Sequence, residues 1–273
     1  MAEIHDASIS IQPFFLESAR GRLFCLSLKP TTKTNAGILY LQPFAEEMHK
    51  SRRMAALQAR AFAHAGFAVL QVDLTGCGDS AGDFGDATWE AWRDDVRLAH
   101  AWLAAQISGD ITLWGLRLGA CLAVDMAAEL AQVTRLLLWQ PVNNGEQFLN
   151  QFLRIKLASE MLSEGRAKTG TKDLLAMLAA GTSIEVGGYL LSPAMAQHLL
   201  LIKLAEQIPH CAVEWIEVGV EAGDHVTPAS QRVVDTWRAA GVEVRTRTVP
   251  GDPFWVTQEI AECPGLIETG NKM

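Results

Sequence analysis

From Gly37 onward, short apolar segments alternate along the chain with longer amphipathic segments. This alternation is typical of a buried parallel sheet whose two faces are covered by helices, so it predicts an α/β fold. Apolar spacing over residues 50–65, followed by Gly66, predicts the helix of a first βαβ unit. The predicted strands cover residues 36–41, 67–74, 111–114, 134–139, 213–218 and 242–249.

Three further segments complete this outline. The first 35 or so residues alternate like an antiparallel hairpin that extends the sheet at one edge. A tryptophan-rich helix follows the loop LTGCGDSAGDFGD, with Asp86 or Thr88 as its cap. Residues 143–207 look mostly helical, with a helix start at Ser192 and Pro193. We therefore expect one domain over residues 1–273, in which residues 143–207 form a helical lid.

Composition narrows the class of protein. The 273 residues are 49% hydrophobic, which is enough for a large core, and the net charge of -8 disfavours nucleic acid and anionic lipid as partners. The longest apolar runs fall short of the ~18 residues that span a membrane, and MAEIHDASIS lacks the pattern of a signal peptide. These features predict a soluble cytoplasmic protein with no membrane span, and they leave the oligomeric state open.

The cysteines and the other metal-binding residue types give no sign of a metal or a cofactor. The five cysteines are odd in number and scattered, with no CxxC pair, as expected in a reducing compartment. No His, Asp or Glu pair has ligand spacing with a third partner nearby. We therefore expect neither a metal site nor a cofactor.

The segment ITLWGLRLGACLAVDM predicts a strand, a tight turn and a helix. Gly115 and Gly119 flank the turn with the spacing of the nucleophile elbow GxSxG, in which small residues permit a strained turn. That turn raises one side chain above the end of the sheet. In this chain the raised side chain is Arg117.

Three other segments follow the order expected of an α/β-hydrolase fold. LYLQPFAEEM ends a strand where such proteins place a backbone oxyanion donor, here near Phe44. DLTGCGDSAG matches the DxxGxGxSxG loop that follows the next strand. Far downstream, VGVEAGDHVTP resembles the loop that supplies the acid of a catalytic triad, with Asp224 as the acid and Pro228 behind it. The sequence therefore predicts a mostly parallel sheet with helices on both faces, in the α/β-hydrolase arrangement.

A closer resemblance covers nearly the whole chain. The segments QPFAEEMHKSRRM, WGLRLGA, LLLWQPVNNGEQFLNQFLRIKLASEM and VPGDPFW together resemble the exosortase A system-associated hydrolase family, second type. Members of that family are encoded beside exosortase and exopolysaccharide genes in Gram-negative bacteria. The resemblance implies a hydrolase of that system and names no substrate.

The residues at the elbow argue against ordinary ester cleavage. A guanidinium stays protonated in water and cannot attack a carbonyl, so Arg117 is not a nucleophile. The final strand leads into VPGDPFWVTQE, and where the superfamily usually has a histidine this chain offers Asp252, Pro253, Phe254 and Trp255. Asp224 and the adjacent His225 are the candidates for a residual acid and base, and a solvent-facing His225 is the alternative. Cys77 is the candidate thiol, and an inert buried cysteine is its alternative.

Arg117 has two interpretations. In the first, its guanidinium and the helix N-terminus at Leu118 hold an acidic or acylated small molecule. In the second, Arg117 forms an internal ion pair with Asp224, Glu46 or Glu47, with Asp224 as the first choice. The candidate pocket residues are Arg117, Leu118, Phe44, Glu46, Glu47 and Gln42. Two functions follow: a hydrolase or acyl-transfer enzyme with an unconventional site, or an inactive protein that binds a ligand in the elbow pocket or docks a partner through its lid.

Overall fold

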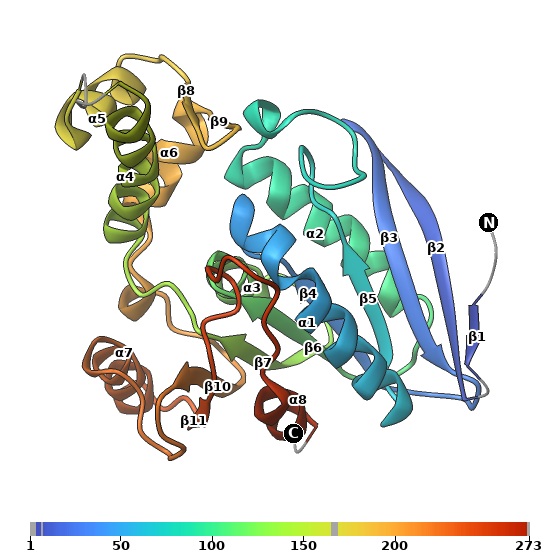
Figure 1. The fold of residues 1–273 in the computed structure, drawn as a ribbon. Helices are drawn as coiled ribbons and strands as arrows, with labels where there is room; N and C mark the ends of the chain where they lie inside the picture. The colour runs from blue at the N-terminus through green and yellow to red at the C-terminus, as the bar shows by residue number, and fades with distance from the viewer. Residues whose placement is uncertain (1–3, 7, 165–168, 272–273) are drawn as a thin grey trace.

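One large sheet organises the computed structural model, which describes residues 4–6, 8–164 and 169–271. Within these residues the sheet has nine strands in the order β1-β2-β3-β5-β4-β6-β7-β10-β11 (Figure 1). The strands are β1 (Ile4–Asp6), β2 (Ile9–Ser18), β3 (Gly21–Pro30), β4 (Gly37–Leu41), β5 (Ala68–Val72), β6 (Ile111–Leu116), β7 (Val133–Trp139), β10 (Ala212–Gly219) and β11 (Val244–Pro250).

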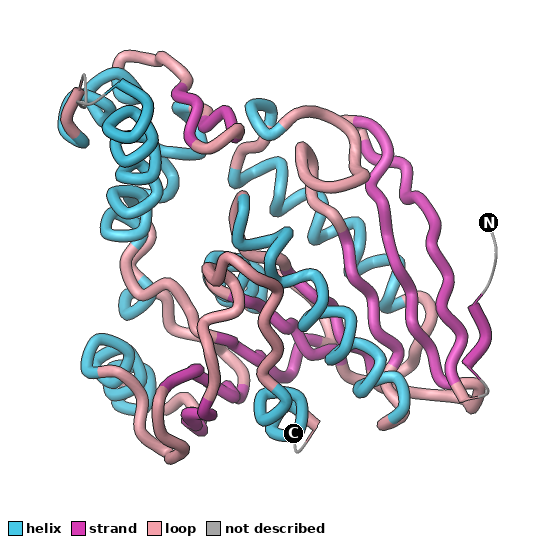
Figure 2. Tube along the Cα trace, viewed as in Figure 1, coloured by secondary structure: helices cyan, strands magenta, loops and turns pink. Residues whose placement is uncertain are grey.

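The six strands β5, β4, β6, β7, β10 and β11 run parallel, and β1, β2 and β3 add an antiparallel edge. Figure 2 shows the strands in magenta and the helices in cyan. The six predicted parallel strands and the predicted N-terminal hairpin are confirmed. The short strand β1, which pairs with β2 at the outer edge, was not predicted.

Helices cover both faces of the sheet. On one face, α1 (Glu46–His64) and α8 (Pro264–Gly270) pack over residues that include Tyr40 and Trp114. On the other face lie α2 (Trp89–Ala104), α3 (Leu118–Ala127) and α7 (Pro228–Ala239). The residues of β4 alternate between the two cores, because successive side chains of a strand point to opposite faces. The alternation places Leu39 with α2 and Tyr40 with α1.

Helix starts are predicted well where a side chain caps the helix and poorly where none does. Thr88 caps α2, and its hydroxyl accepts a hydrogen bond from the Ala91 N–H at 3.1 Å. By contrast, α1 begins at Glu46 rather than at Lys50, and its N-cap residue Ala45 has a φ of 52° and no side-chain cap bond. An alanine in that conformation carries no sequence signal of a helix start.

The segment between β7 and β10 forms a mostly helical insertion with a small hairpin, which stands apart from the sheet in Figure 1. Ser192 caps the last α-helix of the insertion by accepting from the Met195 N–H, as its Ser-Pro start predicts. The hairpin was not predicted. The elements of the insertion are α4 (Gly145–Glu164), α5 (Thr171–Ala179), β8 (Ile184–Val186), β9 (Tyr189–Leu191), α6 (Pro193–Leu201) and η2 (Leu204–Glu206). None of the helices in the described residues is long and apolar enough to span a bilayer.

A histidine joins the insertion to α2. The His198 ring of α6 stacks on Trp89, with ring centroids 4.6 Å apart and an interplanar angle of 13°. The charged groups that act on His198 are Asp125, Arg93 and Glu90. Burial is the largest influence, and it lowers the pKa of His198 below the ordinary imidazole value.

We expect this histidine to make the fold less stable in mild acid. Because the folded-state pKa of His198 is lowered, the unfolded chain binds more protons below about pH 6.5, and the free energy of unfolding falls as pH falls through that region. His198→Phe keeps a ring on Trp89 and removes the titration. Urea denaturation at about pH 7.5 and pH 5.5 should show a smaller stability loss in the variant than in the natural chain. Equal losses would contradict the assignment. The His198→Phe variant will still lose some stability at about pH 5.5, because burial also lowers the pKa of His100.

Candidate functional site

The turn between β6 and α3 has the backbone of a nucleophile elbow. Arg117 at its tip has φ 56° and ψ -117°, a strained conformation that costs on the order of 1–3 kcal/mol. A Cβ on Gly115 would lie 2.4 Å from the Gly119 carbonyl oxygen, and a Cβ on Gly119 would lie 2.2 Å from that of Leu41. Both positions therefore require glycine.

The Arg117 side chain forms an ion pair with Glu47 of α1. Its Nε and Nη2 atoms each lie 3.1 Å from Glu47 Oε1, and its Nη1 lies 3.5 Å from the Gln140 carbonyl oxygen. The sequence expectation of a nearby carboxylate is met, but the partner is Glu47 rather than Asp224. Asp224 is exposed on the loop after β10. The position of Glu47 depends on where α1 begins, and the sequence predicted that start at residue 50 instead of Glu46.

Two aromatic rings flank the same guanidinium. The Arg117 Cζ lies 5.5 Å from the centroid of Trp255 and 6.0 Å from that of Phe148. Trp255 is 6% exposed and follows β11, in the segment where the superfamily usually places its histidine. Cation–π contact at these distances adds about 0.5–2 kcal/mol and fixes the plane of the guanidinium.

A cleft of about 330 Å³ opens beside Arg117. It lies between the start of α1, the elbow, helix α4 and the loop after β11. Its lining residues are Phe44, Ala45, Glu46, Glu47, Lys50, Arg117, Phe148, Gln151, Phe152, Ile155, Trp255 and Val256. This elbow cleft thus combines a charged end at Arg117 with an apolar wall on α4. Among the described residues that line it there is no serine, cysteine or histidine.

The structure brings together four of the predicted pocket residues, Phe44, Glu46, Glu47 and Arg117. Leu118 is buried directly behind them as the first residue of α3. Gln42 lines a different cavity, on the α1 side of the sheet.

The predicted acid and base lie apart from the elbow cleft. His225 is exposed and lines a shallow cavity with Glu217 and Thr248. The main chain of this loop is held by β11, because the hydroxyls of Thr246 and Thr248 donate to the carbonyl oxygens of Asp224 and His225. Neither side chain lines the elbow cleft.

Two helix N-termini converge on the elbow cleft. The N-cap residues of α1 and α3 are Ala45 and Arg117; both line the cleft, both have positive φ, and neither makes a side-chain cap bond. The first N–H groups of a helix have no carbonyl partner within it and carry partial positive charge. The arrangement therefore favours a negatively charged or carbonyl oxygen.

Glu47 is the titratable group most affected by this environment. Burial raises the pKa of Glu47, and the neighbouring Arg117 opposes that rise only in part. Its Oε2 atom is buried and has no hydrogen-bond partner in the described structure.

The glycine-rich loop after β5 contributes no nucleophile. Cys77 is buried, and burial together with Asp73 raises its pKa to about 12, so the thiol stays protonated. The inert alternative therefore applies to this cysteine. Ser80 holds the turn: its hydroxyl accepts from the Phe24 N–H and donates to the Asp73 carbonyl oxygen.

Sequence reasoning missed the contribution of the insertion. Phe148, Phe152 and Ile155 of α4 line the elbow cleft, at spacings that place them on one helix face. That apolar stripe was visible in the sequence, but a stripe alone does not say which neighbouring element it faces. Gln151 and Lys50 also line the elbow cleft and were not predicted.

Comparison with known proteins agrees with this fold. A family model of X-Pro dipeptidyl-peptidases, the S15 family, matches residues 26–144. Est1E from Butyrivibrio proteoclasticus is 15% identical, with a TM-score of 0.65 over 95% of this chain and 96% of its own. A highly thermostable carboxyl esterase from Bacillus coagulans is 17% identical, with a TM-score of 0.59 over 88% of this chain and 90% of its own.

A third solved structure is the alpha/beta hydrolase domain-containing protein 10 from mouse, 18% identical, with a TM-score of 0.56 over 88% of each chain. No curated protein sequence matches the chain significantly. At these sequence identities, likeness to the solved structures shows the fold alone. The sheet order, the elbow and these likenesses together show that the chain has an α/β-hydrolase fold.

Proposed function

We propose that this protein binds the carboxylate or acyl end of a small amphiphilic molecule in the elbow cleft and forms no acyl-enzyme with it. The observation that carries the proposal is the Arg117 side chain, raised at the elbow, paired with Glu47 and covered by Trp255. A permanent cation in this position binds oxygen anions and cannot form an ester.

The shape and charge of the elbow cleft support an amphiphilic ligand. Arg117 and the two helix N-termini supply donors at one end, and Phe148, Phe152 and Ile155 supply an apolar wall. About 330 Å³ has room for roughly eleven water molecules at ~30 Å³ each, or for a medium-length acyl chain. We therefore take a fatty carboxylate such as decanoate as the first ligand to test.

The test of the missing covalent step uses intact-mass spectrometry and ester turnover. After incubation with a fluorophosphonate probe or p-nitrophenyl esters and thioesters, we expect no mass adduct and no turnover above the buffer rate. Arg117→Ser should not create an efficient esterase, because none of the described residues lining the elbow cleft is a histidine. An adduct on the natural chain, or turnover lost in a folded Arg117→Ala variant, would contradict the proposal.

We also propose that the insertion over residues 143–207 acts as a lid on the elbow cleft. The tip of its hairpin contacts the cleft, since the Tyr189 hydroxyl donates to Glu46 Oε2 at 3.0 Å. Tyr189 also packs edge-on against Phe84, 5.1 Å between centroids.

Removing this contact should speed ligand release. Tyr189→Phe keeps the ring and deletes one hydrogen bond to a carboxylate, so we expect decanoate to dissociate about tenfold faster. Stopped-flow displacement of a fluorescent fatty acid would measure the rate. A dissociation rate equal to that of the natural chain would argue against a lid.

A second candidate, an unconventional hydrolase, is favoured by one observation. Glu47 Oε2 is buried without a partner in the described structure, and burial raises the pKa of Glu47, as suits a general base that activates water. Ester turnover that disappears in Glu47→Gln while decanoate still binds would establish this candidate over the first.

We further propose a cytoplasmic role in an exosortase-linked exopolysaccharide system. The support is the resemblance of the segments around Glu47, Arg117 and Trp255 to that family, together with the α/β-hydrolase fold. Deleting the gene in its host should change the amount or the acylation of the exopolysaccharide. An unchanged polysaccharide would count against this role.

A further inference from the structure

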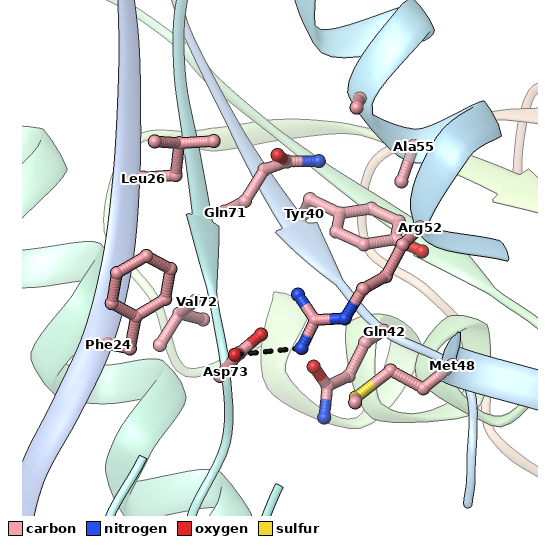
Figure 3. A pocket seen from close by; sticks show the side chains of 11 residues that line it. Phe24, Leu26, Tyr40, Gln42, Met48, Arg52, Ala55, Gln71, Val72 and Asp73 are labelled. Atoms are coloured by element: carbon pink, nitrogen blue, oxygen red, sulfur yellow. Dashed lines mark hydrogen bonds and ion pairs between the residues drawn. The ribbon is translucent and has the colours of Figure 1, made fainter. Parts of the chain in front are cut away.

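A second cavity lies on the other side of α1, between that helix and the sheet (Figure 3). Its volume is about 220 Å³, and it is independent of the elbow cleft and of the function proposed for it. The lining residues are Phe24, Leu26, Tyr40, Gln42, Met48, Arg52, Ala55, Ala56, Gln71, Val72 and Asp73. We call it the α1 cavity.

The floor of the α1 cavity is built by three neighbouring strands. Leu26 of β3 and Tyr40 of β4 are both paired with Gln71 of β5, so the three side chains stand side by side on one face. The next row brings Phe24 beside Asp73, whose N–H donates to the Phe24 carbonyl oxygen at 2.9 Å. The site is therefore set by strand register, which makes its geometry rigid.

The α1 cavity carries no net charge. Arg52 and Asp73 are the two charged residues of its lining, and they form an ion pair with Nη2 and Oδ2 2.9 Å apart. The same Asp73 oxygen accepts from the Asp79 N–H at 3.0 Å. The N-cap residue of α1, Ala45, lines the elbow cleft and is not among the residues that line this cavity.

One buried hydrogen-bond donor of the lining lacks an acceptor, and a second has only a weak one. Tyr40 is 6% exposed and Gln42 is 3% exposed. Within the described part of the chain the Tyr40 hydroxyl has no hydrogen-bond partner, whereas the Gln42 amide lies against the Cys77 thiol, which is a weak acceptor. A buried polar group without a partner is costly, and native folds leave few of them. Burial raises the pKa of Tyr40, so its hydroxyl remains a donor at any physiological pH.

We propose that the α1 cavity is a second binding site, which takes a small uncharged carbonyl compound with an apolar body. The carbonyl oxygen accepts from the Tyr40 hydroxyl, and the body packs on Phe24, Leu26 and Met48. The volume corresponds to roughly seven water molecules at ~30 Å³ each, which is close to the size of a substituted benzene ring. An aromatic amide has this size and supplies the carbonyl oxygen. Because it is uncharged, Asp73 does not repel it.

The experiment is a ¹⁹F NMR titration with 4-fluorobenzamide, 4-fluoroacetophenone and 4-fluorobenzoate, which differ in charge and share one shape. We expect the two uncharged probes to bind saturably and the benzoate to bind at least about tenfold more weakly. Tyr40→Phe removes one donor and keeps the ring, so it should weaken both uncharged probes about tenfold. The Tm of Tyr40→Phe should equal or exceed that of the natural chain, because the lost hydroxyl has no partner in the described protein.

Each other result would overturn the proposal. Equal or tighter binding of the benzoate would make this an anion site. Probe affinity unchanged by Tyr40→Phe would place the probe elsewhere, and loss of binding in Arg117→Gln would place it in the elbow cleft. A lower Tm of Tyr40→Phe would show that the hydroxyl is already bonded. Absence of binding up to the solubility of the probes would show that the α1 cavity holds only water.

Discussion

Gly119→Ala should lower the free energy of unfolding by about 3 kcal/mol or more. The added Cβ would lie 2.2 Å from the Leu41 carbonyl oxygen and 2.4 Å from that of Gln42. Both oxygens belong to the backbone at the end of β4, in the middle of the sheet, where a shift would disturb the neighbouring strands. Relief would require the elbow to move away from β4, which would also displace Arg117. Urea denaturation followed by circular dichroism measures the loss.

Gly265→Ala is the matched control. Its Cβ would meet nothing closer than the Val249 Cβ at 3.9 Å, and the residue lies in α8, where alanine is favoured over glycine by up to about 1 kcal/mol. We expect this variant to be as stable as the natural chain or slightly more so. If both variants unfold at the same urea concentration, the elbow does not make the close approach to β4 described here.

Arg117→Gln should weaken the binding of decanoate by about 10- to 100-fold. A hydrogen bond to a charged group contributes about 1.5–3 kcal/mol, and glutamine keeps much of the side-chain length without the charge. The change also leaves the Glu47 carboxyl without its partner. The double variant Arg117→Gln, Glu47→Gln removes that unpaired acid and should remain as weak, because the cation is still missing. Isothermal titration calorimetry measures all three affinities.

Arg247→Gln controls for the loss of one positive charge. Arg247 is exposed on β11, and it is not among the residues that line the elbow cleft. Its removal should change decanoate affinity less than twofold at about 0.15 M salt, where charges this exposed are largely screened. Equal weakening in Arg117→Gln and Arg247→Gln would mean that the overall charge of the protein, rather than the elbow, attracts the ligand.

The fold was predictable because its signals are local. The central strands β4, β5 and β6 are short apolar runs, and helices such as α2 carry a capping residue at their start. The exceptions are elements without such a signal. Ala45, the N-cap residue of α1, has a positive φ and no cap bond, and the β8–β9 hairpin consists of two strands of only three residues each.

Only those residues of the candidate site that lie close together in the sequence could be predicted. Gly115, Arg117 and Gly119 follow from the spacing of the elbow alone. The partner of Arg117 could not be found this way, because Glu47 is 70 residues distant in sequence and its position depends on where α1 begins. The face of the sheet on which Gln42 lies could have been predicted from the sequence. Gln42 is two residues beyond Tyr40, so its side chain lies on the same face, toward α1.

The most direct measurement is a crystal structure of the protein with 10-bromodecanoate, in which anomalous scattering locates the bromine. We expect the intact acid in the elbow cleft, with a carboxylate oxygen about 3 Å from an Arg117 nitrogen and the bromine along α4. An acyl group bonded to the protein, or a carboxylate in solvent while Arg117 contacts Glu47 alone, would contradict the role assigned to Arg117.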